Sequence, residues 1–130
     1  MVIDSSVVIA LFLGEPDQDR YLNAIASDPV RLISVASVLE ISIVLRSRFP
    51  RRDFEQDLEE LTWRFTVVPV DLTQLQFARE AFDRFGRGRH PAGLNFGDCF
   101  TYALARTSGQ PLLFKGQDFA LTDLRLVATA

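Results

Sequence analysis

Four acidic residues lie inside apolar segments or at their ends, and their placement could support catalysis. They are Asp4, Glu40, Asp98 and Asp118. Glu40 is surrounded by aliphatic residues and has no cationic residue at helical spacing before it. Because burying an unpaired carboxylate is costly, this position requires a partner from elsewhere in the fold. A metal ion would be one such partner.

Each of the other three acids also has an ordinary structural interpretation. Asp4 follows a short apolar segment and could cap a helix, although Ser5 and Ser6 could serve as caps as well. Asp98 is expected in the first turn of a helix, where the helix dipole favours a carboxylate. Asp118 could be a turn or cap residue. For each acid taken alone, both interpretations stay open.

A group of carboxylates in one cleft favours a particular kind of ligand. Two unit charges about 4 Å apart repel each other by roughly 4 kcal/mol at an effective dielectric of about 20, and divalent cations relieve that repulsion. Oxygen ligands without a histidine or cysteine cluster indicate Mg²⁺ or Mn²⁺ rather than Zn²⁺. In phosphodiester hydrolysis such ions activate water and stabilise the leaving oxygen. The four acids therefore predict this chemistry if the fold brings them together.

The elements that must position these acids alternate between strands and helices. Short apolar segments predict strands at 1–4, 30–35, 66–70 and 111–114, with a last short strand at 124–128. Apolar residues at helical spacing predict helices at 7–13, 17–26, 37–49, 53–65, 72–85 and 96–107. The segment 86–95, rich in Gly, Arg and Pro, is predicted to be an exposed, mobile loop.

This alternation predicts an α/β fold with a mostly parallel sheet and helices on both faces. Such sheets place their sites beyond the carboxyl ends of the strands, an edge that Asp4 and Asp118 can both reach. A chain of 130 residues with 48% hydrophobic residues is long enough for one such domain and too short for two.

The composition also bears on location and on cysteine chemistry. No apolar run approaches the roughly 20 residues of a membrane-spanning helix, so we expect no membrane insertion. The first residues lack a basic region and a cleavage site for secretion, which predicts a cytoplasmic protein. Cys99 is the single cysteine, so it cannot form an intramolecular disulfide, and we expect it to be a small core residue.

The formal net charge of −3 is unfavourable for binding nucleic acid, but the distribution of charge matters more. If cations neutralise four of the 17 acids, the other 13 face 14 basic residues, of which 13 are Arg. Arginine suits forked contacts to phosphate. We expect Arg87 and Arg89, in the predicted loop, to contact substrate phosphates. His90 in the same loop is expected to have no catalytic role.

Four motifs follow one another along the chain. They are Val-Ile-Asp-Ser-Ser at 2–6, Ser-Val-Leu-Glu-Ile at 37–41, Asn-Phe-Gly-Asp-Cys at 95–99 and Leu-Leu-Phe-Lys-Gly-Gln-Asp-Phe at 112–119. Together they resemble the motifs of PIN-domain ribonucleases, and most of all those of the VapC toxins of bacterial toxin–antitoxin systems. The resemblance covers the whole chain and implies a single PIN-like domain over residues 1–130.

The resemblance assigns roles to individual residues. Asp4, Glu40 and Asp98 match the family's acidic ligands, and Ser6 matches a hydroxyl that supports the site. Many relatives carry an acid two residues before the final Asp-Phe pair, where this chain has a glycine at position 116. Either Asp118 replaces that acid, or the site works with three.

The same resemblance implies an activity and partners. Asp4 and Asp98 would bind Mg²⁺ or Mn²⁺, with Glu40 and Asp118 acting directly or through water. The activity would be endonucleolytic cleavage of RNA, often structured RNA such as tRNA. A homodimer and a cognate VapB-type antitoxin that inhibits the nuclease are also implied.

Two other functions remain to be tested. A phospho-receiver module would use Asp71 after a middle strand as the phosphate acceptor, with Lys115 after a late strand. The chain lacks the two adjacent acids that a receiver needs after its first strand, and a receiver would give Glu40 no role. A catalytically silent PIN-like binding domain would show no metal-dependent cleavage. This alternative is disfavoured because all the best-matched acids are present.

Overall fold

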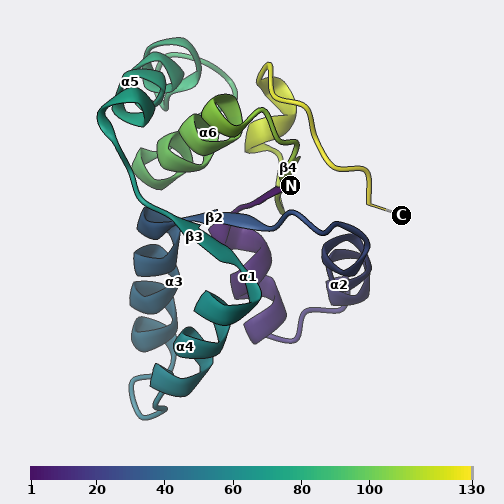
Figure 1. The fold of residues 1–130 in the computed structure, drawn as a ribbon. Helices are drawn as coiled ribbons and strands as arrows, with labels where there is room; N and C mark the ends of the chain where they lie inside the picture. Colours follow the sequence, from purple (N-terminus) through teal and green to yellow (C-terminus); the bar gives the residue numbers. More distant parts are fainter. Residues whose placement is uncertain (130) are drawn as a thin grey trace.

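The computed structural model describes residues 1–129, which form a four-stranded sheet between two layers of helices (Figure 1). All neighbouring strands are parallel, in the order β3-β2-β1-β4. The strands are short: β1 Val2–Ile3, β2 Leu32–Ser34, β3 Thr66–Val68 and β4 Leu112–Leu113. The predicted fold class, an α/β domain with a parallel sheet, is confirmed.

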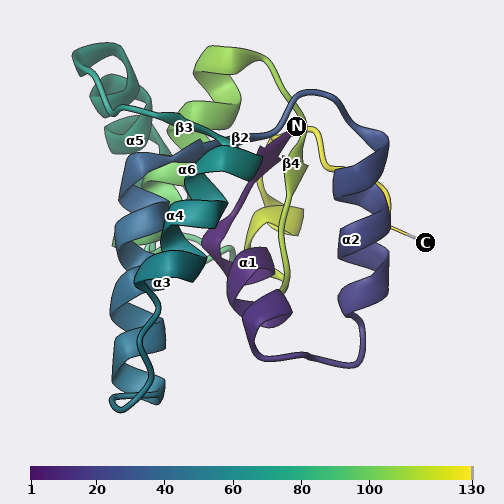
Figure 2. The same cartoon turned by 60° about the horizontal axis from the view of Figure 1, so that its bottom comes forward.

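Six α-helices and one 3₁₀ helix surround the sheet. They are α1 Ser5–Phe12, α2 Gln18–Ser27, α3 Val35–Arg48, α4 Glu55–Arg64, α5 Leu72–Phe85, α6 Phe96–Ser108 and η1 Asp118–Leu121. Helices α5 and α6 lie on one side of the sheet, and α1, α3 and α4 lie on the other (Figures 1 and 2). Within residues 1–129, no helix has both the length and the apolar composition needed to cross a membrane.

Alternation along the short strands divides the core into two parts. Val2 and Leu112 pack with the apolar residues of α5 and α6. Ile3, Ile33 and Leu113 pack with those of α1, α3 and α4. Because successive side chains of a strand point to opposite faces, even two-residue strands serve both layers. This double burial holds the carboxyl ends of the strands in place.

Two helix starts differ from the prediction. Asp4, rather than either serine after it, caps α1 by accepting a hydrogen bond from the backbone N–H of Ser6 at 3.0 Å. Helix α3 begins at Val35 and is capped by Ser34, whereas Ser37 is buried inside the helix. A cap is selected by where the strand ends in three dimensions, and the local sequence offered several competing polar residues.

Two segments in the second half of the chain also differ from the prediction. The expected strand at 124–128 is reduced to an isolated parallel bridge between Leu126 and Leu112. The loop at 86–95 is exposed at Arg87 but buries Leu94 completely in the core beside α5 and α6. The prediction of a wholly exposed loop was therefore wrong at its apolar end.

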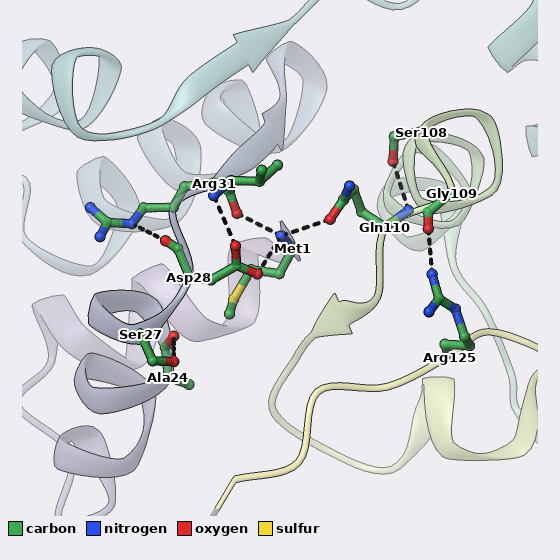
Figure 3. Close-up of polar contacts among 10 residues, drawn as sticks. Met1, Ala24, Ser27, Asp28, Arg31, Ser108, Gly109, Gln110 and Arg125 are labelled. Carbon is green, nitrogen blue, oxygen red and sulfur yellow. Dashed lines mark hydrogen bonds and ion pairs between the residues drawn. The ribbon is translucent and has the colours of Figure 1, made fainter.

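The first residue of the chain lies inside the fold (Figure 3). The amino group of Met1 donates hydrogen bonds to Asp28 Oδ2 at 2.8 Å, to the carbonyl of Val30 at 2.5 Å and to Gln110 Oε1 at 3.2 Å. The hydrogen bond from this amino group holds the pKa of Asp28 below its usual value. These contacts fix β1 between the segments that lead into β2 and β4, and so fix the position of Asp4.

Candidate active site

The four predicted acids come from four elements that meet at the carboxyl edge of the sheet. Asp4 follows β1, Glu40 lies in the second turn of α3, Asp98 lies in the first turn of α6, and Asp118 begins η1 after β4. The charges of the other three acids all raise the pKa of Asp98. The fold therefore brings the four carboxylates into one electrostatic neighbourhood.

Asp4 is the most buried of the four, with an exposed fraction of 4%. Its Oδ2 accepts from the N–H of Ser6 at 3.0 Å, and its Oδ1 accepts from the hydroxyl of Thr101 at 2.7 Å. Hydrogen bonds to a carboxylate favour its charged form and offset the cost of burial. Each oxygen keeps a further lone pair for another ligand.

Glu40 is held between α1 and α6. Its Oε1 accepts a hydrogen bond from the hydroxyl of Ser5, which is itself buried. Its Oε2 lies against the backbone of Gly97, where a methyl group would overlap the carboxylate. Glu40 is half-buried, less than the sequence predicted. It has a hydroxyl partner, and the small residue before Asp98 makes room for its carboxylate.

Asp98 forms a reciprocal cap at the start of α6. Its Oδ2 accepts from the N–H of Asn95 at 2.9 Å, while Asn95 Oδ1 accepts from the N–H of Asp98 at 2.9 Å. Burial raises the pKa of Asp98 to about 7, the Asn95 N–H opposes this, and the charges of Asp4, Asp118 and Glu40 add to it. A free-standing helix cap would not experience three neighbouring carboxylates.

Asp118 and Ser6 lie near the end of β4. Asp118 is exposed, and the glycine at position 116 adopts a φ of 113°, a conformation that L side chains rarely adopt. Ser6 Oγ accepts a hydrogen bond from the N–H of Lys115 at 3.0 Å. The predicted supporting hydroxyl therefore connects the start of α1 to the segment that carries the fourth acid.

Cys99 is a buried free thiol beside Asp98. Its thiol donates to the carbonyl of Asn95 at 3.2 Å, and burial followed by the charge of Asp98 raises its pKa to about 11. A protonated thiol is a poor metal ligand. The prediction of a small core residue is confirmed, and the donors available at this edge are oxygen atoms.

The donor chemistry fits a hard divalent cation. Within residues 1–129, no three acidic, histidine or cysteine side chains converge closely enough to hold one ion as they stand. Three of the acids instead accept separate hydrogen bonds: Asp4 from Thr101, Glu40 from Ser5 and Asp98 from the N–H of Asn95. The repulsion that Asp98 experiences is what a cation bound by oxygen ligands would relieve.

The predicted phosphate contacts lie in the loop before α6. Arg87 is exposed, and its N–H donates to the carbonyl of Leu94 at 3.0 Å. Arg89 is 3.9 Å from Asp83 Oδ1 and lies over the ring of Phe82 at 5.2 Å. Both guanidinium groups are on the surface.

His90 is a structural residue of the same loop. Its Nδ1 accepts from the N–H of Ala92 at 3.1 Å, and its ring packs edge-on against Phe85. These contacts give His90 a local packing role.

The residues of the phospho-receiver alternative do not form a site. Asp71 caps α5 by accepting from the N–H of Gln74 at 2.8 Å. Lys115 Nζ instead donates to Asp17 Oδ1 at 2.9 Å and also to Glu15. The lysine is thus engaged with two acids beside α2, and the phosphate-acceptor arrangement is absent from the described residues.

Three residues of the site were missed in the sequence. Ser5 was considered only as a helix cap, and Gly97 and Thr101 were given no role. Gly97 directly precedes Asp98, and Thr101 follows it by one helical turn. Residues three apart share a helix face, so a hydroxyl at this spacing from a candidate ligand was the available signal.

Comparison with known proteins identifies the family. The family model of the PIN domain matches residues 1–124. A curated protein named Ribonuclease VapC, from Mycolicibacterium smegmatis, is 52% identical over 128 residues, which cover 98% of this chain and 99% of that protein.

Two solved structures have the same fold. The crystal structure of VapC20 from Mycobacterium tuberculosis, titled as a sarcin-ricin loop cleaving toxin, has a TM-score of 0.77 at 21% identity and covers 97% of each chain. A toxin–antitoxin complex from Klebsiella pneumoniae has a TM-score of 0.72 at 18% identity, with 94% of this chain and 92% of that chain covered. The chain therefore belongs to the PIN-domain family and, within it, to the VapC group.

Proposed function

We propose that this protein is a metal-dependent endoribonuclease that hydrolyses phosphodiester bonds of RNA and acts as the toxin of a toxin–antitoxin pair. The observation that carries the proposal is the placement of Asp4, Glu40 and Asp98 at the carboxyl edge of the sheet, where burial and the charges of Asp4, Asp118 and Glu40 raise the pKa of Asp98. Family membership supports the same activity, because the 52% identical relative is named a ribonuclease.

The four acids would have different roles in binding the metal ion. Asp4 and Asp98 would hold the ion, and Glu40 and Asp118 would bind it directly or through water. A bound Mg²⁺ or Mn²⁺ supplies polarisation of the phosphate and a lowered pKa for water. Ser6 and Asn95 keep Asp4 and Asp98 in place through their backbone N–H groups, 3.0 Å and 2.9 Å from the carboxylates.

The substrate would be a structured RNA such as a tRNA. The structurally similar VapC20 is described as a toxin that cleaves the sarcin-ricin loop. Arg87 and Arg89 are both exposed, and they would add phosphate contacts from the loop before α6. Replacing both with alanine should weaken RNA binding and reduce its salt dependence, and unchanged affinity at both low and high salt would remove them from the substrate site.

A VapB-type antitoxin would be the inhibitory partner, since one protein of the same fold was solved as a toxin–antitoxin complex. A basic side chain of that partner would be attracted to the four carboxylates. Both proteins would act in the cytoplasm, where RNA substrates occur. Co-expression with a cognate VapB-type antitoxin should yield a stable complex with little ribonuclease activity.

A homodimer is supported by exposed apolar side chains on α3, α5 and α6. Leu39 is 61% exposed, Leu72 84% and Phe96 81%. A contiguous exposed apolar patch marks an interaction surface in a soluble protein. Light scattering should give twice the mass of the chain, and Leu72→Lys should shift the protein toward monomer if this face is the interface.

Expression in a bacterial host tests the proposal in cells. Induction of the wild-type chain without antitoxin should stop growth and produce RNA fragments with defined ends. Asp4→Asn, which keeps the size of the side chain and removes its charge, should do neither at equal protein level. Growth arrest by both proteins, with no RNA fragments, would favour a catalytically silent binding domain.

A further inference from the structure

Two hydroxyl groups meet beneath the acids, where α3 packs against α6. Ser37 and Thr101 are buried, with exposed fractions of 4% and 1%, and their Oγ atoms lie 3.4 Å apart. Thr101 Oγ1 also lies 2.7 Å from Asp4 Oδ1. The three side chains form a continuous buried series of contacts from α3, through α6, to the end of β1.

The direction of these hydrogen bonds follows from counting protons. An ionised carboxylate can only accept, so Thr101 gives its single hydroxyl proton to Asp4. Thr101 then has no proton left for Ser37, and Ser37 must be the donor in that contact. The series therefore runs from Ser37 to Thr101 to Asp4, and a hydroxyl that accepts a hydrogen bond becomes a better donor.

Threonine hydroxyls in helices usually bond to the helix itself, and α6 contains an example. Thr107 Oγ1 donates to the carbonyl of Ala103 at 2.9 Å, one turn before it. Thr101 forms its hydrogen bond with an acid 97 residues away in the sequence. Its hydroxyl is committed to Asp4, so its role differs from that of the other threonine on the same helix.

Sequence spacing connects the two hydroxyls to two further acids. Thr101 lies three residues after Asp98 on α6, and Ser37 lies three residues before Glu40 on α3. Residues three apart face the same side of a helix. Each helix therefore presents one acid and one hydroxyl together, and the contact between the hydroxyls sets the two acids relative to each other.

We propose that Thr101 is a positioning residue for metal binding, whose hydroxyl, oriented by Ser37, fixes the Asp4 carboxylate in the geometry that receives the ion. The inference deepens the proposed metal-dependent function and rests on it. With Oδ1 held by Thr101 and Oδ2 by the N–H of Ser6, the carboxylate cannot rotate about its own axis without losing a buried hydrogen bond. Outer partners of this kind commonly change metal affinity by about 10- to 100-fold when removed.

Calorimetric titration of the purified protein with Mn²⁺ alone tests the proposal. Thr101→Val keeps the shape of the side chain and removes the hydroxyl, and it should weaken Mn²⁺ binding by about tenfold or more. Thr101→Ser restores the hydroxyl and should bind Mn²⁺ nearly as well as wild type. Thr107→Val is the matched control on the same helix and should change nothing. Circular dichroism verifies that every variant is folded.

The rate of RNA cleavage provides a second measurement on the same variants. If Thr101 positions Asp4, the cleavage rate of Thr101→Val should recover toward that of wild type as the Mn²⁺ concentration is raised. A variant that binds Mn²⁺ as tightly as wild type would overturn the inference, and so would a loss of binding that Thr101→Ser does not restore. Failure of the wild-type protein to bind Mn²⁺ contradicts the proposed function itself and is seen before any variant is compared.

If Thr101→Val does not fold, a second pair of variants tests whether the hydroxyl of Thr101 positions Asp4 for Mn²⁺ binding. Ser37→Ala removes the donor to Thr101 and should weaken Mn²⁺ binding by a smaller factor, about threefold. Ser42→Ala on the same helix removes a hydroxyl that only bonds to the carbonyl of Val38, and should have no effect. Equal Mn²⁺ affinity for these two variants would overturn the proposal.

Discussion

Gly97 on α6 lies so close to the Glu40 carboxylate on α3 that a methyl group on Gly97 would overlap Glu40 Oε2. The contact is with the end of a flexible side chain, so Gly97→Ala should displace the carboxylate and leave the fold intact. Alanine also has the better helix propensity, by up to about 1 kcal/mol. We therefore expect RNA cleavage to fall about tenfold or more while the melting temperature changes little.

The control for this prediction is a double-mutant cycle. In a Glu40→Ala background the carboxylate is gone, and adding Gly97→Ala should reduce cleavage no further. Because the two positions touch, their effects on activity should be strongly non-additive. Independent effects of the two substitutions would show that the close contact has no bearing on the site.

Asp98 should be a source of instability when no cation is present. Its pKa is raised to about 7, chiefly by burial, and also by the charges of Asp4, Asp118 and Glu40. Asp98→Asn can still accept the hydrogen bond from Asn95 and removes the buried charge. In EDTA at pH 8 it should raise the free energy of unfolding by about 2 kcal/mol, and in the presence of Mg²⁺ or Mn²⁺ it should abolish cleavage.

The pH dependence of this gain has a definite sign. Between the unfolded pKa near 3.8 and the folded pKa near 7, the folded protein binds a proton that the unfolded chain does not. Wild-type stability therefore falls as the pH rises through this window, and the advantage of Asp98→Asn should be full above pH 7 and vanish near pH 4. Chemical denaturation at several pH values measures it. An advantage independent of pH would contradict the assignment.

Asp123 should stabilise the packing of α5 and α6 against the segment after η1. It accepts from the hydroxyl of Tyr102 at 2.8 Å and forms ion pairs with Arg84 at 3.1 Å and Arg106 at 3.5 Å. Burial alone would raise the pKa of Asp123, but the Tyr102 hydroxyl and the two guanidinium groups lower it. Asp123→Asn should cost about 1 to 2 kcal/mol of stability at pH 7.

The contribution of Asp123 to stability should depend on pH in the opposite sense to the contribution of Asp98. A depressed folded pKa gives stability that is present above the unfolded pKa near 3.8 and is lost as the pH falls through the folded value. The difference between Asp123→Asn and wild type should therefore shrink below about pH 4. Asp19→Asn, at an exposed position on α2, serves as control and should be neutral. A constant difference down to pH 2 would refute this explanation.

The sequence predicted the order of the six helices and of the first four strands, and it singled out the four acids as candidates, because both inferences use local patterns. Aliphatic residues around Glu40 made that acid exceptional, and the motif at 95–99 drew attention to Asp98. What the sequence could not reveal depends on packing between distant elements. Thr101 binds Asp4 across 97 residues, and Leu94 is buried although it lies in a segment rich in glycine and arginine. No local periodicity carries either contact.

The most direct test of the central claim is cleavage of a tRNA pool by purified, antitoxin-free protein with Mg²⁺ or Mn²⁺, compared with EDTA and with Asp4→Asn and Asp98→Asn. A metal-carboxylate nuclease should produce discrete RNA fragments with either metal, none with EDTA, and none with either variant at equal concentration of folded protein. Cleavage that persists in EDTA or in both variants would contradict a metal-carboxylate nuclease.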